Sequence, residues 1–175
     1  MMRGCVRSFL CGVPSRRRQA GNLSGRVHAI NLERLVKIPF TGGCACGAIR
    51  YECTAEPLEM FQCHCRDCQR ASGGACSYVV IVPATAFRLT RGSPRYHFTE
   101  SAVGFQHKRG FCAECGSRIS GGENAEGTSP IVGITAASLD DPGWFCPQYD
   151  IFTLDAQPWD CMNPLLPKFK EYKTE

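Results

Sequence analysis

The cysteines constrain this chain more than any other feature of its sequence. Seven of the 13 cysteines fall into three short clusters, a C-x-C in "GGCACGAIRYE", a C-x-C-x-x-C in "CHCRDCQRASGG" and a C-x-x-C in "FCAECGSRI". Thirteen cysteines in 175 residues are too many to serve only as small buried apolar side chains. A chain of this length can also bury a core without many crosslinks. The clusters therefore indicate metal binding.

A secreted disulfide scaffold is the first alternative for so many cysteines. The N-terminus, however, lacks the continuous apolar run of a secretory signal, because "SFLCGV" is interrupted and is followed by "SRRRQ". No stretch approaches the length of about 18 apolar residues that a transmembrane helix needs. We therefore expect reduced thiols, a cytoplasmic location and no membrane partner.

Basic residues are concentrated in an N-terminal leader, residues 1–40. The leader carries eight Lys or Arg and one Glu in a chain of net charge +4, so the remainder is mildly acidic. Nucleic acid is therefore not an expected partner of the main domain. We expect the leader to be a disordered or incorrectly started extension, with a transit peptide as the alternative. A twin-arginine export signal is disfavoured, because no apolar segment follows the arginines at 16–18.

From Thr41 onward, short β-rich runs alternate with Gly, Pro and Ser breaks. The runs are rich in Val, Ile, Tyr, Phe and Thr, and several alternate at period two, which is typical of antiparallel sheets. Helical turns are expected only in "RDCQRAS" and in "PLLPKFKEY". We predict one all-β domain of small antiparallel sheets over residues 41–167, with a tail over 168–175. The expected strands are 48–53, 76–82, 86–90, 95–99, 104–111, 117–120, 131–135 and 148–154.

The first and third clusters have the form of metal knuckles. In each, a glycine follows the last cysteine, and Gly47 and Gly116 permit the tight turn that brings backbone N–H groups toward the thiolates. Two knuckles supply the four sulfurs of a closed, structural zinc site. A thioredoxin-like redox pair is disfavoured, because the α/β setting of that motif is absent. The predicted ligands are Cys44, Cys46, Cys112 and Cys115.

The middle cluster has three cysteines, and its fourth ligand decides between a structural and a catalytic zinc. His64 lies between two extended ligands, so its side chain is expected to point away from the metal. His97 and His107 are further candidates, and both zinc ions could be structural. The isolated cysteines are expected to be small buried residues rather than ligands: Cys5, Cys11, Cys53, Cys76, Cys146 and Cys161. By elimination we expect a zinc ion with one open position, held by Cys63, Cys65 and Cys68.

Three thiolates give such a site a net charge near −1, so its zinc should activate water poorly. A fourth sulfur suits an electron-rich zinc ion, and a thiol that coordinates it is held deprotonated near neutral pH. The expected chemistry is therefore attack by a thiol on an aldehyde or another small electrophile. No Ser-His-Asp constellation, phosphate loop or pair of catalytic carboxylates stands out in the sequence.

The three cysteine patterns, followed by "SLDDP" and "QPWD" in that order, resemble the glutathione-dependent formaldehyde-activating family, which also includes centromere protein V. The resemblance spans about residues 41–166 and implies a β-tent fold tied by the structural zinc, with a catalytic zinc on Cys63, Cys65 and Cys68. It also implies a carbon-sulfur lyase that condenses glutathione with formaldehyde to the S-hydroxymethyl adduct. The alternative is a zinc-stabilised module that binds a protein or nucleic acid without catalysis.

Anionic groups of a substrate such as glutathione would need cations near the clusters. Five basic residues lie within sequence reach, although each is individually expected to be a solvated surface charge: Arg66, Arg70, Lys108, Arg109 and Arg118. Trp159 in "QPWD" matches the family's tryptophan, and we expect it to pack in the core or to line a cleft.

Overall fold

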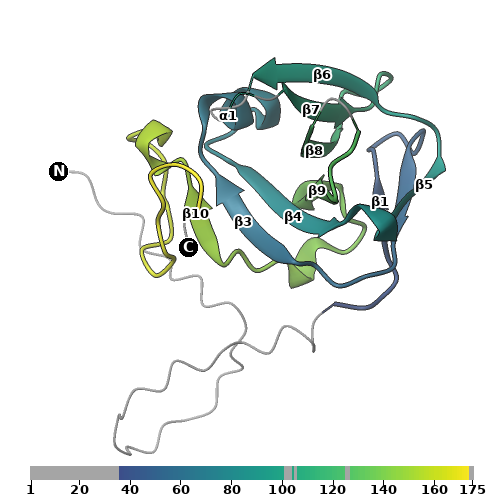
Figure 1. Cartoon of the computed structure of the whole chain (residues 1–175), viewed down its shortest axis with the longest axis horizontal. Coiled ribbons are helices and arrows are strands. Elements are labelled where there is room, and N and C mark those ends of the chain that lie inside the picture. Colours follow the sequence, from purple (N-terminus) through teal and green to yellow (C-terminus); the bar gives the residue numbers. More distant parts are fainter. Residues whose placement is uncertain (1–35, 101–103, 105, 125–126, 174–175) are drawn as a thin grey trace, which may run out of the picture. The chain divides into compact units, whose positions relative to one another are not determined.

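The computed structural model describes residues 36–100, 104, 106–124 and 127–173, and most of the predicted leader lies outside these ranges. Residues Val36–Glu175 form one compact unit. Within the described ranges the unit has two sheets and one α-helix, which confirms the predicted all-β class (Figure 1). No helix in the described part is long and apolar enough to cross a membrane.

The smaller sheet is antiparallel and has the order β1-β2-β5. Its strands are β1 (Phe40–Gly43), β2 (Arg50–Cys53) and β5 (Phe87–Arg91). Tyr51 of β2 is buried, and its hydroxyl forms a hydrogen bond of 2.9 Å with Ser138 Oγ. Gly42 leaves the space for that hydroxyl, because a Cβ at this position would lie 2.2 Å from the Tyr51 oxygen. The sheet thus presents the β1–β2 loop, which contains the first cysteine cluster, at its edge.

The larger sheet has seven strands in the order β10-β3-β4-β9-β8-β7-β6. Every neighbouring pair is antiparallel except β10 and β3, which are parallel. The strands are β3 (Glu59–Cys63), β4 (Ser77–Pro83), β6 (Arg95–Glu100), β7 (Gln106–Phe111), β8 (Arg118–Asn124), β9 (Ile131–Thr135) and β10 (Tyr149–Ile151). Met60, Val80, Val82 and Ile134 are fully enclosed and form much of the core.

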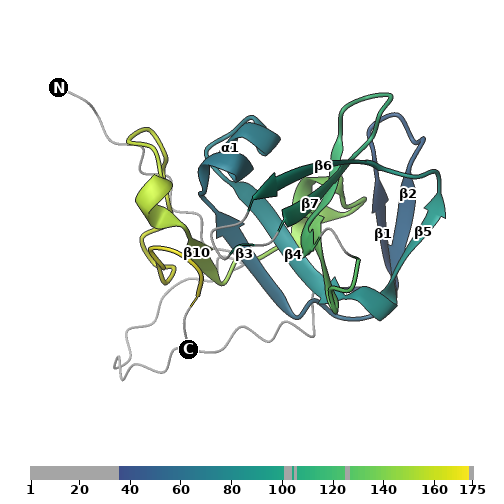
Figure 2. The same cartoon turned by 45° about the horizontal axis from the view of Figure 1, so that its top comes forward.

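The α-helix, α1 (Arg66–Ser72), follows β3 directly and occupies the segment where a helical turn is predicted. Among the described residues, four short 3-10 helices lie in the connections: Ala84–Ala86, Ala136–Ser138, Pro142–Trp144 and Thr153–Asp155. In Figures 1 and 2, β3 and β4 run between the smaller sheet at one end of the unit and β10 at the other. The middle cysteine cluster lies at the junction of β3 and α1, because Cys63 ends β3 and Cys65 precedes the helix.

The chain after β10 returns along that strand. Phe169 N–H donates to the carbonyl of Asp150 at 2.9 Å, and Phe152 N–H donates to the carbonyl of Glu171 at 3.0 Å. The segment predicted to form a helical turn, "PLLPKFKEY", instead contains turns and an isolated bridge between Lys168 and Asp150. The last described residues thus form part of the wall beside β10.

Candidate metal centre

The structure brings Cys44, Cys46, Cys112 and Cys115 into one group, with all four sulfurs within 4.8 Å of one another. The sulfurs of Cys44 and Cys46 are 3.5 Å apart, and those of Cys46 and Cys112 are 3.7 Å apart. A tetrahedral ion with thiolate bonds of about 2.3 Å requires sulfur–sulfur distances of about 3.8 Å. The four thiols are therefore arranged as a closed metal shell between the β1–β2 loop and the β7–β8 turn.

Backbone geometry explains why these two turns can act as knuckles. Gly47 and Gly116 adopt φ values of 76° and 73°, in the left-handed region that favours glycine. The N–H of Ile49 donates to Cys44 Sγ at 3.1 Å, as the glycine-based turn predicts. Gly116 N–H donates to the carbonyl of Cys112 at 2.9 Å and closes the second turn.

Ser117 is a contact that the sequence did not reveal. Its Oγ accepts from Ala45 N–H at 3.1 Å and lies 3.2 Å from Cys115 Sγ, so it joins the two knuckles. Hydrogen bonds from the Ser117 hydroxyl and backbone lower the pKa of Cys115 to about 5. This residue thus favours the thiolate form, which is the form that binds a metal.

The second group contains Cys63, Cys65 and Cys68, and their sulfurs also lie within 4.8 Å of one another. Cys63 ends β3, Cys65 is the N-cap of α1, and Cys68 lies in the first turn of the helix. Cys65 Sγ accepts a hydrogen bond from Cys68 N–H at 3.4 Å. In the described part of the chain, no fourth His, Cys, Asp or Glu joins this group.

His64 does point away from the three sulfurs, into a set of buried carboxylates. Its ring is fully enclosed, with Nδ1 at 2.6 Å from Asp160 Oδ2 and Nε2 at 3.3 Å from Asp150 Oδ1. Lys168 Nζ lies 3.4 Å from the other oxygen of Asp150. The amide of Gln69 donates to the His64 carbonyl. These contacts, called here the His64 bracket, fix the backbone between Cys63 and Cys65.

The predicted role of Trp159 is wrong. Its side chain is 64% exposed and lines neither the core nor the cavity beside the cysteines. The buried tryptophan is Trp144, whose ring lies 5.2 Å from that of Phe40. Within "QPWD" the residue that makes the buried contact is Asp160, one position later.

Each of the five basic residues near the clusters was expected to be a solvated surface charge, and Arg109 of β7 is the one that is buried and reaches a cluster sulfur. Its Nη1 lies 3.7 Å from Cys68 Sγ, and its Nε donates to Thr99 Oγ1 at 2.8 Å. Hydrogen bonds from the other two cluster thiols, with a further contribution from the positive charge of Arg109, lower the pKa of Cys68 to about 2 against the effect of burial. Arg70 is exposed and Lys108 lies over the ring of Tyr96, whereas Arg66 and Arg118 line a cavity beside the three-cysteine group.

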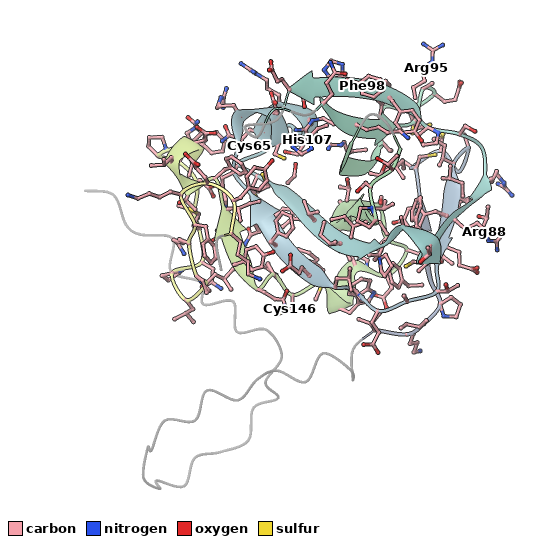
Figure 3. The ribbon with its side chains drawn as sticks, viewed as in Figure 1. Cys65, Arg88, Arg95, Phe98, His107 and Cys146 are labelled. Carbon is pink, nitrogen blue, oxygen red and sulfur yellow. The ribbon has the colours of Figure 1, made fainter. Side chains whose placement is uncertain are left out.

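A cavity of about 720 Å³ opens beside the three-cysteine group and includes all three cysteines in its wall. Cys65, the N-cap of α1, and His107, on β7, both line this cavity, and Figure 3 labels the two side chains. Its wall includes apolar side chains from β3, β10 and the following turn, and polar ones from β7 and the C-terminal segment. The lining residues include Phe61, Ile151, Phe152, His107, Arg109 and Tyr172.

None of the isolated cysteines in the described ranges joins either group. Cys53 and Cys76 are buried as predicted, whereas Cys146 is partly exposed and Cys161 is exposed. Cys5 and Cys11 lie outside the described residues. No disulfide joins any two cysteines of the described part.

Comparison with known proteins places this geometry in a family. A family model described as glutathione-dependent formaldehyde-activating enzyme matches residues 39–155. Proteins that carry this as a provisional name are 27% identical in Phaeosphaeria nodorum and 28% identical in Talaromyces marneffei, each over 65% of this chain. The chain spans 62% and 63% of their lengths. A crystal structure of a Rhodobacter sphaeroides protein is 19% identical, with a TM-score of 0.45 over 74% of this chain and 98% of that chain. Because the family model covers more than half of the sequence, the chain belongs to the glutathione-dependent formaldehyde-activating enzyme family.

Proposed function

We propose that this protein is a zinc-dependent carbon-sulfur lyase that adds the thiol of glutathione, or of a related small thiol, to formaldehyde. One observation carries the proposal. Three cysteine sulfurs lie close enough to share an ion, no fourth side-chain ligand joins them in the described residues, and a cavity opens beside them. This arrangement is typical of catalytic zinc, which keeps one position for substrate.

The four-cysteine group and the three-cysteine group have different roles in this proposal. Four thiolates complete a zinc shell, so Cys44, Cys46, Cys112 and Cys115 would hold a structural ion. Cys63, Cys65 and Cys68 would hold the second ion, which keeps a coordinating thiol deprotonated near neutral pH. The site suits this chemistry, because zinc with three thiolates is a poor activator of water.

The remaining walls favour a small thiol as substrate. The cavity volume of about 720 Å³ falls in the usual range of small-molecule sites. Phe61, Ile151 and Phe152 line it with apolar surface, which limits access of water to the reacting atoms. Arg109 places a positive charge 3.7 Å from Cys68 Sγ, where it partly offsets the negative charge of the thiolates.

The direct test follows adduct formation from glutathione and ¹³C-formaldehyde by NMR exchange. We expect the protein to exceed the uncatalysed rate. Cys65→Ser should reduce the acceleration by more than about 100-fold, beyond the 10–100-fold range of changes outside the ligand set. Cys161→Ser, at an exposed cysteine outside both groups, is the matched control and should retain full acceleration. No acceleration by the unmodified protein would overturn the proposed reaction.

Removal of metal should separate the two sites. We expect mild chelation to extract one zinc ion per chain first, because a shell with an open position exchanges ligands more readily than a closed one. Metal content and acceleration should fall together in this phase while far-UV circular dichroism stays unchanged. Loss of both ions in a single phase would instead indicate that both sites are closed and structural.

A further inference from the structure

Glu59 and Lys173 form an ion pair in the wall of the cavity that contains the three cysteines. Glu59 begins β3, and Lys173 lies in the C-terminal segment that returns along β10. Lys173 Nζ donates to Glu59 Oε1 at 2.8 Å, and the Tyr149 hydroxyl donates to Glu59 Oε2 at 2.7 Å. The Lys173 ammonium group also lies over the Tyr149 ring, 4.8 Å from its centroid. Adjacent positive and negative charges are therefore held in place in the wall.

Both members of this pair retain hydrogen-bonding capacity for a ligand. An ammonium group has several donors and an ionised carboxylate several acceptor sites, and the contacts with one another and with Tyr149 use only part of them. The side chains of Lys173 and Glu59 are 46% and 39% exposed, so the other sites are accessible. Burial disfavours ionisation of Glu59, but hydrogen bonds from Lys173 and Tyr149 outweigh it and lower the pKa of Glu59. Its carboxylate is therefore charged at pH 7.

Strand β3 sets the distance between the ion pair and the three-cysteine group. Glu59, Phe61 and Cys63 alternate along the strand, so their side chains share a face, and all three line the cavity. At a rise of about 3.3 Å per residue, the Cα atoms of Glu59 and Cys63 are about 13 Å apart. In an extended γ-glutamyl-cysteine unit, the thiol sulfur lies about 9 Å from the α-amino acid head group. A contact of about 4 Å between that sulfur and a cysteine sulfur makes up the remainder.

The wall between these two ends is apolar. The Phe61 and Tyr149 rings stack with their centroids 5.3 Å apart and their planes at 13°. In the parallel pairing of β10 with β3, Tyr149 lies beside Phe61 and Ile151 lies beside Cys63. The methylene groups of a γ-glutamyl chain suit this surface, because they carry no polar group that burial would leave unpaired. The cavity thus matches a ligand with a charged head group, an apolar linker and a thiol.

We propose that Glu59 and Lys173 bind the α-amino acid head group of a γ-glutamyl thiol and so select the substrate. The selection rests on the proposed function, which supplies the thiol. Lys173 donates to the α-carboxylate, and Glu59 accepts from the α-ammonium group. Another pair of opposite charges in the wall, Arg109 with Asp67 at 4.0 Å, lies beside Cys68 and therefore at the reacting end.

A comparison of substrates tests the selection. γ-Glutamylcysteine has the head group and lacks the glycine of glutathione, whereas N-acetylcysteinylglycine has the glycine and lacks the head group. We expect kcat/KM of the unmodified protein to be at least about 10-fold higher for γ-glutamylcysteine, the size of one hydrogen bond to a charged group. Lys173→Met, and separately Glu59→Gln, should lower kcat/KM for γ-glutamylcysteine about 10-fold and leave that for N-acetylcysteinylglycine unchanged. Lys170→Met, at an exposed lysine outside the cavity wall, is the matched control and should change neither value.

A binding measurement separates this selection from the reaction. S-methylglutathione has the head group but no thiol, and isothermal titration calorimetry gives its dissociation constant. Both variants should bind it about 10-fold more weakly than the unmodified protein, with an unchanged metal content and unfolding midpoint. If the unmodified protein does not bind it, or if both variants bind it equally tightly, the selection is overturned and the proposed reaction stands on its own test. If binding depends on the pair but formaldehyde addition is not accelerated, the proposed reaction is overturned and recognition of the γ-glutamyl head group stands.

Discussion

Cys112→Ser is expected to prevent folding of the whole domain. Cys112 is fully buried in the four-cysteine group, which joins the smaller sheet at the β1–β2 loop to the larger sheet at the β7–β8 turn. Structural zinc sites contribute apparent binding free energies on the order of 10–16 kcal/mol in finger peptides. This exceeds or matches the 5–15 kcal/mol that typically stabilises a domain. Loss of one ligand should therefore leave most of the chain unfolded at 25 °C.

Far-UV circular dichroism and urea denaturation would measure this effect. Cys161→Ser should keep the unfolding midpoint of the unmodified protein, because Cys161 is exposed and belongs to neither group. The Cys65→Ser variant should remain folded. The ligands of the three-cysteine group lie at the end of β3 and the start of α1, so they do not join the two sheets. A Cys112→Ser variant with an unchanged midpoint would show that the four-cysteine group is not a structural site.

The partition of the seven clustered cysteines could be predicted from spacing because each knuckle is local. A glycine directly after the last cysteine is a short-range signal for the turn, and the φ values of Gly47 and Gly116 agree with it. The strands with many β-branched and aromatic residues were also predictable. β9 is found at the expected residues, and β4 begins and ends one residue later than expected.

Two strands were not predicted, because tertiary packing rather than strand propensity accounts for their residues. β1 reads "FTGG", and glycine is a poor strand residue, but Gly42 makes room for the buried hydroxyl of Tyr51. β3 reads "EMFQC" and contains no β-branched residue, yet it pairs on both sides, with β10 and β4. In both strands tertiary packing outweighs intrinsic propensity.

The residues around the three-cysteine group could not be predicted because their contacts are distant in sequence. Asp150 and Asp160 meet His64 across 86 and 96 residues, and Arg109 meets Cys68 across 41. The motif "QPWD" does contain a residue that contacts the site, but the prediction assigned the buried role to its tryptophan and not to its aspartate. Only the fold shows that the aspartate provides the contact and that Trp159 is exposed.

Asp150→Ala is expected to cost about 3–5 kcal/mol in the free energy of unfolding. Asp150 is fully enclosed, and its two oxygens face His64 Nε2 at 3.3 Å and Lys168 Nζ at 3.4 Å. Removing one member of a buried charged network leaves the others without compensation, which accounts for the magnitude. Asp140→Ala is the matched control, because its ion pair with Arg50 is partly exposed and should contribute no more than about 1 kcal/mol.

A double-mutant cycle distinguishes loss of the His64 bracket from general damage to the core. If Asp150 acts through His64, the combined His64→Gln and Asp150→Ala change should cost less than the sum of the two single changes, by about 0.5–3 kcal/mol. The three-cysteine site should also bind zinc about 10–100-fold more weakly in each variant, since His64 fixes the backbone between Cys63 and Cys65. The four-cysteine site in the same molecule serves as the internal reference for that measurement. Additive costs together with unchanged zinc retention would mean that the buried aspartate supports the core but not the metal site.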